Sequence, residues 1–273
     1  MAAALRYGAG EEAAPQGEQK RMFKNALITG ASSGIGRSLA LGLAKQGIEV
    51  VIAARRQPEL QALRQEIEKA GGIAHVAVLD VARPREAVAE IQRFDDKLGG
   101  LDMVIANAGI GRVGSFKKAT WDKIEAMCQV NFTGAIATLT ALVPRMVTRR
   151  RGHLVGVSSL IAHAPHAPGS LVYQATKIGF SAFLDGLRFE LAGTGVAVTA
   201  IHPGFVQTEM TAPNKHPMPF VMTVEQATER ILRTLSHAPG RIDFPLPMTL
   251  LTKAAAMIPD SLTSAISARL KIG

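Results

Sequence analysis

The segment Thr29-Gly30-Ala31-Ser32-Ser33-Gly34-Ile35-Gly36 lies between a short apolar run and a helix-like stretch that begins Arg37-Ser38-Leu39-Ala40. Three glycines allow a tight turn, close approach of the backbone to a pyrophosphate and close helix packing, and the helix N-terminus adds free N–H groups. Glycine triplets also occur in plain loops, but the position between strand and helix favours a dinucleotide-binding loop. The Gly-Lys-Ser/Thr ending of a nucleotide-hydrolase loop is missing.

Short apolar runs alternate with longer amphipathic stretches around this loop. The pattern predicts strands at Ala26–Thr29, Glu49–Ala54, Ile73–Leu79, Asp102–Ala106, His153–Val157, Val196–Ile201 and, at an edge, Ile242–Phe244. It predicts helices at Gly34–Gln46, Pro58–Ala70, Pro84–Leu98, Trp121–Val147, Val172–Ala192 and Val224–Ser236. Continuous apolar strands between helices indicate an α/β fold with a Rossmann-type, doubly wound parallel sheet of about seven strands in a single domain, with helices on both faces.

Three regions are expected along the chain. Residues 1–21 have no apolar period and are predicted to be a flexible N-terminal tail. Residues 22–245 form the dinucleotide-binding and catalytic domain, with a substrate lid at about 209–222. Residues 246–273 form a C-terminal helical extension of the same domain.

Composition excludes several classes of protein. Of the 273 residues 47% are hydrophobic and 19% are charged, which is enough for a real core and excludes a disordered chain. The net charge is +9, but the only clear basic run is Arg149–Arg151, and aromatic residues are few, so we expect no nucleic-acid partner. The single cysteine, Cys128, fits a reducing compartment, and no apolar run reaches the length of a membrane span. We expect a cytoplasmic protein.

Two arginines follow the second predicted strand, in Ala53-Ala54-Arg55-Arg56. A site that holds the 2′-hydroxyl of an NAD ribose carries an acidic residue at this place. A small residue followed by two guanidinium groups suits a 2′-phosphate instead. We therefore expect Arg55 and Arg56 to contact NADP(H). The alternative is that both begin a solvated helix with Glu59 nearby.

Tyr173 and Lys177 are four residues apart in a helix-like stretch, so their side chains lie on one face. Tyrosine has a pKa of about 10 and is a poor base at neutral pH. A nearby ammonium and a positively charged nicotinamide both favour the phenolate. The pair is a candidate catalytic pair, although this spacing alone is more often a surface coincidence. Upstream, Ser158 and Ser159 end an apolar strand, where one of them could bind a substrate oxygen or cap the next turn.

Together these motifs closely resemble the short-chain dehydrogenase/reductase family, from about Lys24 to Met210. Asn131, Tyr173 and Lys177 match the catalytic positions of the family. Ser159 is preferred to Ser158 as the catalytic serine, since its distance from Tyr173 already exceeds the commonest spacing by one residue. Beyond the glycine loop and the arginines, the cofactor contacts that the resemblance implies are Asp80, Val81, Asn107, Ala108, Gly109, Tyr173, Lys177, Pro203, Gly204, Val206 and Thr208.

The resemblance implies reversible hydride transfer between NADP(H) and a small-molecule ketone or secondary alcohol. Tyr173 would exchange the proton, Ser159 would hold the oxygen, and Lys177 would lower the tyrosine pKa and hold the nicotinamide ribose. Asn131 would fix a water that links Lys177 to solvent. Apolar residues in the lid suggest an apolar substrate. The alternative is a regulator that binds NADP(H) without turnover.

Three further expectations concern assembly and ligands. The charge-poor stretch Ala126–Pro144 and the helix after Tyr173 are predicted to pair in a homo-oligomer, the alternative being that both pack on the sheet. His163 and His166 are interpreted as loop or substrate-pocket histidines rather than metal ligands. The apolar C-terminal segments Pro247–Ile258 and Ser261–Ile272 are predicted to be helices packed on the core or a partner subunit, with weak docking on a membrane surface as the alternative.

Overall fold

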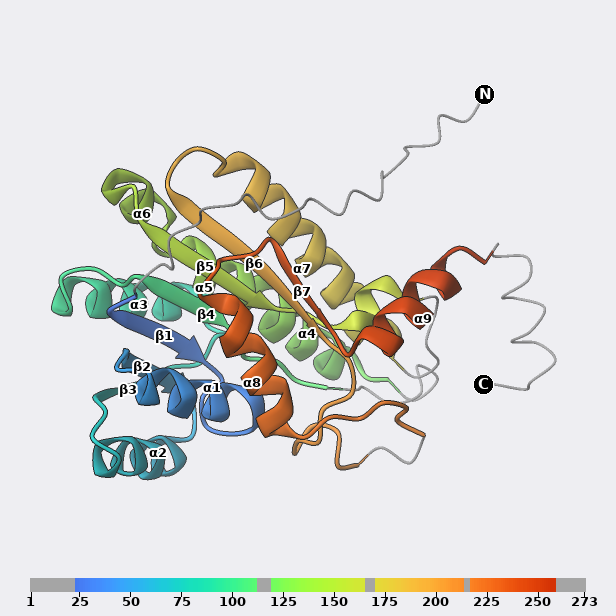
Figure 1. Cartoon of the computed structure of the whole chain (residues 1–273), viewed down its shortest axis with the longest axis horizontal. Coiled ribbons are helices and arrows are strands. Elements are labelled where there is room, and N and C mark those ends of the chain that lie inside the picture. The colour runs from blue at the N-terminus through green and yellow to red at the C-terminus, as the bar shows by residue number, and fades with distance from the viewer. Residues whose placement is uncertain (1–22, 112–118, 165–169, 214–216, 259–273) are drawn as a thin grey trace.

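The sheet has seven parallel strands in the order β3-β2-β1-β4-β5-β6-β7 (Figure 1). The computed structural model describes residues 23–111, 119–164, 170–213 and 217–258, so the predicted N-terminal tail, His166 and the segment Ser261–Ile272 lie outside it. The strands are β1 (Asn25–Thr29), β2 (Glu49–Ala54), β3 (Ala74–Val78), β4 (Met103–Ala106), β5 (Gly152–Val157), β6 (Val196–Pro203) and β7 (Arg241–Phe244). The predicted fold class is confirmed, because every neighbouring pair runs parallel.

Helices connect the strands and cover both faces of the sheet. They are α1 (Gly34–Lys45), α2 (Gln57–Lys69), α3 (Pro84–Lys97), α4 (Trp121–Cys128), the π-helical turn η2 (Gln129–Gly134), α5 (Ala135–Thr140), α6 (Val143–Arg149), the 3₁₀ turn η3 (Leu160–His163), α7 (Leu171–Glu190), α8 (Val224–Leu235) and α9 (Leu246–Ala256). Side chains alternate across the pleat, so Ile28 packs with α1, α2 and α8 while Leu27 packs with α3, α5 and α7. Each core is therefore closed by its own layer of helices.

The single helix predicted over Trp121–Val147 is wrong, because the chain breaks it twice. The π-helical turn η2 holds Asn131, whose side chain bonds the backbone of Ile110 on both its N–H and its carbonyl group. A second break lies at Leu142, where the backbone leaves helical geometry (φ −118°, ψ 2°). Pro144 follows and has no N–H with which to continue the helical bonds. Helical periodicity in the sequence contains neither of these interruptions.

The same stretch bears on membrane insertion. Among the described residues, only Trp121–Arg149 is long and apolar enough to cross a bilayer by length and composition. Half of its most apolar window is buried inside the protein. A core helix of a globular protein passes the same test, and here η2, α5 and α6 supply Val130, Leu139 and Met146 to the core beneath the sheet.

The C-terminal helix α9 exists as predicted, but its packing differs from the prediction. It lies at the edge of the molecule against β7 and η3 (Figure 1). Thr249 and Thr252 are its buried side chains, whereas Leu250 and Leu251 are 59% and 54% exposed. The helix thus packs on this chain through its threonines, while these two leucines stay exposed. Cover by a partner subunit and docking on a membrane surface stay open.

Candidate active site

A cavity of about 470 Å³ opens at the carboxyl ends of the strands, where the strand order reverses between β1 and β4. Ligands of doubly wound sheets bind in this crevice. Most of the residues predicted for the site line it: Gly30, Ser32, Ser33, Gly34, Ile35, Arg55, Arg56, Asp80, Val81, Asn107, Ala108, Gly109, Ser159, Tyr173, Lys177, Pro203, Gly204, Val206 and Thr208. Gly36 and Asn131 do not line the cavity but lie behind its wall.

The glycine loop is built for close approach of backbone to backbone. Gly30 has φ +69°, and a Cβ there would lie 2.8 Å from Cα of Ala108. A Cβ on Gly36 would lie 2.4 Å from the carbonyl oxygen of Gly30. Nδ2 of Asn107 donates to the carbonyl oxygen of Thr29 at 3.0 Å, which joins the ends of β1 and β4. The first turn of α1 thus opens on the cavity with free N–H groups, an arrangement that binds phosphate.

The rim beside β2 is positively charged. Nε and Nη2 of Arg56 lie 3.2 and 3.1 Å from Oγ of Ser32 in the glycine loop. Nη2 also lies 3.4 Å from Oε2 of Glu209, and Nη1 lies 3.6 Å from Oε1 of Glu59. Arg56 therefore begins α2 near Glu59, as the alternative interpretation predicts. Its guanidinium group also faces the glycine loop. Arg55 lines the same end of the cavity.

The candidate catalytic pair lies near the start of α7. Nζ of Lys177 lies 5.8 Å from the ring centre of Tyr173, and it donates a hydrogen bond of 2.9 Å to the carbonyl oxygen of Val157. Burial lowers the pKa of Lys177 from 10.5 to about 8. Burial raises the pKa of the Tyr173 hydroxyl above its ordinary value, and a hydrogen bond with Ser159 opposes that rise. The lowering of the Tyr173 pKa by Lys177 stays a prediction, because the cause that lowers this pKa here is the hydrogen bond with Ser159.

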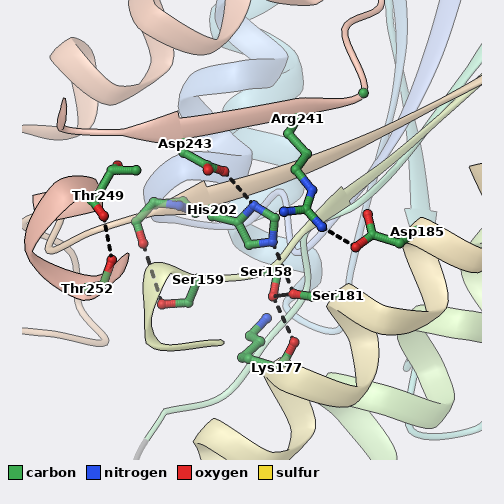
Figure 2. Close-up of polar contacts among 12 residues, drawn as sticks. Ser158, Ser159, Lys177, Ser181, Asp185, His202, Arg241, Asp243, Thr249 and Thr252 are labelled. Carbon is green, nitrogen blue, oxygen red and sulfur yellow. Dashed lines mark hydrogen bonds and ion pairs between the residues drawn. The ribbon is translucent and has the colours of Figure 1, made fainter. Parts of the chain in front are cut away.

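The structure separates the two serines at the end of β5. Ser159 caps η3 by accepting a bond from the N–H of Ile161 at 3.3 Å, and its hydroxyl also interacts with Tyr173. Ser158 is buried, and its hydroxyl faces α7, where it bonds the carbonyl oxygen of Lys177 and the hydroxyl of Ser181 (Figure 2). Ser159 is thus placed to reach a substrate oxygen beside Tyr173. It also caps the next turn, which was the alternative role predicted for a serine here.

Asn131 holds the backbone next to the site. Besides its two bonds to Ile110, its Nδ2 lies 3.5 Å from Oγ1 of Thr176. A Cβ on Gly109 would lie 3.4 Å from Oδ1 of Asn131 and 3.8 Å from Nζ of Lys177. Asn131 therefore lies behind Lys177, and its predicted role in fixing a water stays a prediction.

Three titratable side chains meet beside the site, on η3, β6 and β7. Donor atoms of His163, His202 and Asp243 lie within 4.8 Å of one another. The His163 ring lies 4.5 Å from that of His202, centre to centre and tilted by 54°, and His163 does not line the cavity. Both ring nitrogens of His202 already have partners, and Arg241 and Lys253 add positive charge. These features disfavour a divalent ion at this cluster.

Several wall residues were not predicted as site residues. They are Ala53, Ala54, Leu79, Ile110, Val130 and Val157. Those that end β2 and β5 could have been found from the rule that ligands bind at the carboxyl ends of strands. Glu209, Met210 and Thr211 belong to the predicted lid, but the approach of Glu209 to Arg56 had no signal in the sequence, because it joins positions 153 residues apart.

The glycine loop, the Tyr173–Lys177 pair and Ser159 meet at one cavity, and comparison with known proteins agrees with that geometry. The family model described as short chain dehydrogenase matches residues 24–219. The chain belongs to this family. Oxidoreductase activity and a nicotinamide cofactor, both predicted from the sequence, are properties of short chain dehydrogenases and are confirmed at that level.

Individual relatives of this short chain dehydrogenase agree. An uncharacterized oxidoreductase of Myxococcus xanthus is 44% identical over 249 residues, which are 91% of this chain and 98% of that protein. A short-chain dehydrogenase from Sphingobium yanoikuyae, solved in complex with NADPH, has a TM-score of 0.76 and 28% identity, covering 90% of this chain and 94% of its own. The bulky-bulky ketone specific alcohol dehydrogenase of Comamonas testosteroni has a TM-score of 0.73 and 25% identity, covering 91% and 92%.

Proposed function

We propose that this protein is an NADP(H)-dependent oxidoreductase that transfers a hydride between the cofactor and a carbonyl or secondary alcohol of an apolar small molecule. The observation that carries the proposal is the meeting of Ser159, Tyr173 and Lys177 at the inner end of a cavity whose outer end is the glycine loop. Such a cavity can hold a dinucleotide with its reactive end beside a proton donor.

Charge at the β2 rim supports NADP(H) over NAD(H). Arg55 and Arg56 stand at the end of β2, where no acidic residue is present to hold a ribose 2′-hydroxyl. Guanidinium groups bind phosphate through charge-assisted hydrogen bonds. The Sphingobium neighbour, solved with NADPH, has the same fold. The glycine loop and the first turn of α1 would hold the pyrophosphate, and Lys177 the nicotinamide ribose.

Each catalytic side chain has a separate task in the proposal. The bound cofactor supplies the hydride, which joins the carbonyl carbon. Tyr173 donates its hydroxyl proton to the carbonyl oxygen, so that an alcohol forms and a phenolate remains. Ser159 holds the same oxygen and polarises the carbonyl. Lys177 stabilises the phenolate by its positive charge, and Asn131 fixes a water that links Lys177 to solvent.

An apolar substrate is favoured by the segment that follows β6. In the proposed lid, residues 209–222, Met210 lines the cavity, and Phe220 and Val221 are exposed near its mouth. Met222 bridges back to Val206 and anchors the far end of the segment. The Comamonas neighbour acts on bulky-bulky ketones, which agrees with an adaptable apolar pocket.

The proposal extends to organisation and assembly. We take residues 22–245 as the catalytic domain, residues 246–273 as its C-terminal extension, and the cytoplasm as its location. A homo-oligomer is favoured by exposed apolar side chains on η2 and α7, namely Phe132, Ile178 and Phe189. Phe132 packs over Gly179, so the two helical elements form one continuous surface.

The test is a spectrophotometric assay. NADPH absorbance is followed after addition of a panel of ketones and aldehydes, from small aromatic ketones to ketones with two bulky substituents, with NADH in parallel. We expect NADPH to be consumed with at least one bulky ketone and NADH to be consumed more slowly. Binding of NADPH without consumption on any carbonyl, and no reduction of NADP⁺ by the matching alcohols, would favour the regulator instead.

A further inference from the structure

A chain of buried polar contacts runs from β7 to α7 behind the candidate site (Figure 2). Oδ1 of Asp243 lies 2.8 Å from Nδ1 of His202, and Nε2 of His202 lies 3.1 Å from Oγ of Ser181. Oγ of Ser181 lies 2.8 Å from Oγ of Ser158, which donates to the carbonyl oxygen of Lys177 at 3.1 Å. His202 is fully buried and the two serines are nearly so, so the contacts depend on one another rather than on bulk water.

The number of protons needed to form all of these contacts indicates the charge of the groups that make them. Both ends accept only: the carbonyl oxygen of Lys177 has no proton, and an ionised Asp243 has none. Burial opposes ionisation of Asp243, but the bond from His202 and the nearby positive charges together lower the pKa of this carboxyl. Four contacts need four protons. Two hydroxyls and a neutral imidazole supply three, so the fourth belongs to the Asp243–His202 pair. Nζ of Lys253 lies 3.7 Å from Oδ2 of Asp243 and favours the ionised carboxylate, which places the fourth proton on the imidazole.

We propose that His202 works as an imidazolium held by Asp243, and that this pair positions Lys177 through Ser181 and Ser158. With the fourth proton every bond has one direction, from His202 to Ser181, then to Ser158, then to Lys177. Without it, one contact brings two lone pairs together and is lost. The proposal rests on the proposed function only in the role it gives to Lys177.

Charged groups around His202 come from every element packed against it. Asp243 and Arg241 lie on β7, Lys253 on α9 and His163 on η3. Nζ of Lys253 is 3.7 Å from Oδ2 of Asp243, and Arg241 pairs with Asp185 of α7 (Figure 2). Burial, and then the charge of His202, lower the pKa of His163. Asp243 is thus the carboxylate available to His202, while Asp185 serves Arg241.

This series of contacts holds Lys177 and the neighbouring Ser159 from two sides. The backbone of Lys177 is bound by Ser158, and its side chain by the preceding Val157, so that β5 fixes both parts of one lysine. Ser159 follows Ser158, and its hydroxyl lies 3.4 Å from the carbonyl oxygen of Pro203, which follows His202. Without the fourth proton, Ser181 donates to His202, and the one proton of Ser158 is then shared between Ser181 and the carbonyl oxygen of Lys177, which weakens the hold on Lys177. His202 and Asp243 are positioning residues, since neither lines the cavity.

The proton count is measured directly by nitrogen NMR of the full chain labelled with ¹⁵N-histidine. The sequence has seven histidines, and the His202 signals are identified by their loss in His202→Gln. We expect both ring nitrogens of His202 to carry protons at the pH of highest activity, and Asp243→Asn to convert the ring to the neutral form. One proton on the wild-type ring at that pH overturns the proposal. So does a shift of these signals by added Zn²⁺ that EDTA reverses, since the cluster would then be a metal site.

Kinetics separate positioning from mere stability. In Asp243→Asn we expect the alkaline loss of kcat to begin about one pH unit lower than in wild type, with KM for NADPH changed less than about twofold. Ser181→Ala removes the hydroxyl that links His202 to Ser158. This variant should lower kcat to a similar extent while the imidazole of His202 keeps both of its protons. The matched control is His153→Asn, which removes another buried sheet histidine, bonded to Thr199 and outside the chain. It should lower stability without moving the pH profile.

Failure of each claim has its own signature. If the Asp243→Asn and His153→Asn variants lose stability alike and both keep the wild-type pH profile, the chain is structural and the positioning role is wrong. If wild type consumes no NADPH with any carbonyl, the proposed function fails, yet the NMR experiment still decides the proton count. That experiment needs only wild type and His202→Gln, so an Asp243→Asn or Ser181→Ala variant that does not fold leaves the proposal testable.

Discussion

Nζ of Lys177 donates a hydrogen bond of 2.9 Å to the carbonyl oxygen of Val157, the last residue of β5. The lysine lines the cavity but is only 4% exposed, so its ammonium is largely shielded from water. Burial lowers its pKa to about 8, because a low-dielectric environment disfavours the charged form. The protein therefore carries an expensive positive charge beside Tyr173, where a phenolate would need it.

The first prediction concerns stability and pH without cofactor. The folded-state pKa of Lys177 lies below the unfolded value of 10.5, so the folded protein loses this proton first as pH rises. Burial of the charge costs stability below about pH 8, and the cost fades between about pH 8 and pH 10.5. We expect the unfolding free energy of Lys177→Met, relative to wild type, to fall by about 3 kcal/mol over that range.

Urea unfolding at several pH values checks this. Lys69→Met, on the exposed surface of α2, is the matched control and should differ from wild type by the same amount at each pH. A constant difference between Lys177→Met and wild type across the range would show that burial does not disfavour the ammonium.

The second prediction concerns the proton donor. Tyr173→Phe should abolish turnover, because the ring still packs but the hydroxyl is gone. Binding of NADPH, measured by fluorescence titration, should stay within about threefold of wild type, since only one hydrogen bond is removed. Lys177→Ala should damage both turnover and binding. Retention of more than a few per cent of the activity in Tyr173→Phe would mean that another group or a water is the acid.

The third prediction concerns cofactor choice. Arg55→Ala and Arg56→Ala should each weaken NADPH binding about tenfold and leave NADH nearly unchanged, because a charge-assisted bond to the 2′-phosphate is lost. Calorimetry with both cofactors measures the ratio. Equal losses for NADPH and NADH would contradict a 2′-phosphate site.

A substitution of Glu209 should change NADPH binding in the opposite direction. Its carboxylate lies 3.4 Å from Nη2 of Arg56, at the edge where a 2′-phosphate would bind. Glu209→Gln removes a negative charge that competes with the phosphate, so NADPH should bind a few times more tightly and NADH should not. Tighter binding of both cofactors would assign Glu209 to the lid rather than to phosphate selection.

The fourth prediction concerns assembly. Ile178→Asp and Phe189→Asp place charges on the exposed apolar face of α7 and should convert an oligomer to monomer, because a charge at a buried interface is costly. Light scattering at micromolar concentration measures the mass. Ile73→Asp, at an exposed site before β3, is the control and should keep the wild-type mass. A monomeric wild-type protein would mean that the α7 face is not an oligomer interface.

The fifth prediction concerns α9. Its exposed leucines need a cover, either a partner subunit or a membrane surface. If a subunit covers them, Leu250→Ser with Leu251→Ser should lower the oligomer mass or solubility and should not change sedimentation with vesicles. Co-sedimentation of wild type with anionic phosphatidylserine vesicles at low salt, lost in the double variant, would assign α9 to membrane docking.

Local sequence alone determined the strands, the glycine loop and the placing of Tyr173 and Lys177 on one helix face. Parallel strands are buried on both faces, so their sequences are continuous apolar runs. The turn after β1 needs glycine at positions where a side chain would overlap the backbone. Tyr173 and Lys177 share a face because a helix brings residues four apart together. Each of these features depends on neighbours within a few positions, and a linear pattern contains that information.

Tertiary structure decided what depends on distant partners. The bonds from Asn131 to Ile110 accompany the π-helical turn η2, and helical periodicity cannot predict it. Burial raises the pKa of Tyr173, and burial is a property of the packed molecule. The contact from Asp243 to His202 joins positions 41 residues apart, and that from Ser181 to Ser158 joins positions 23 apart. Only the parallel sheet brings the ends of β5, β6 and β7 to one edge, where their polar groups must pair because water is excluded.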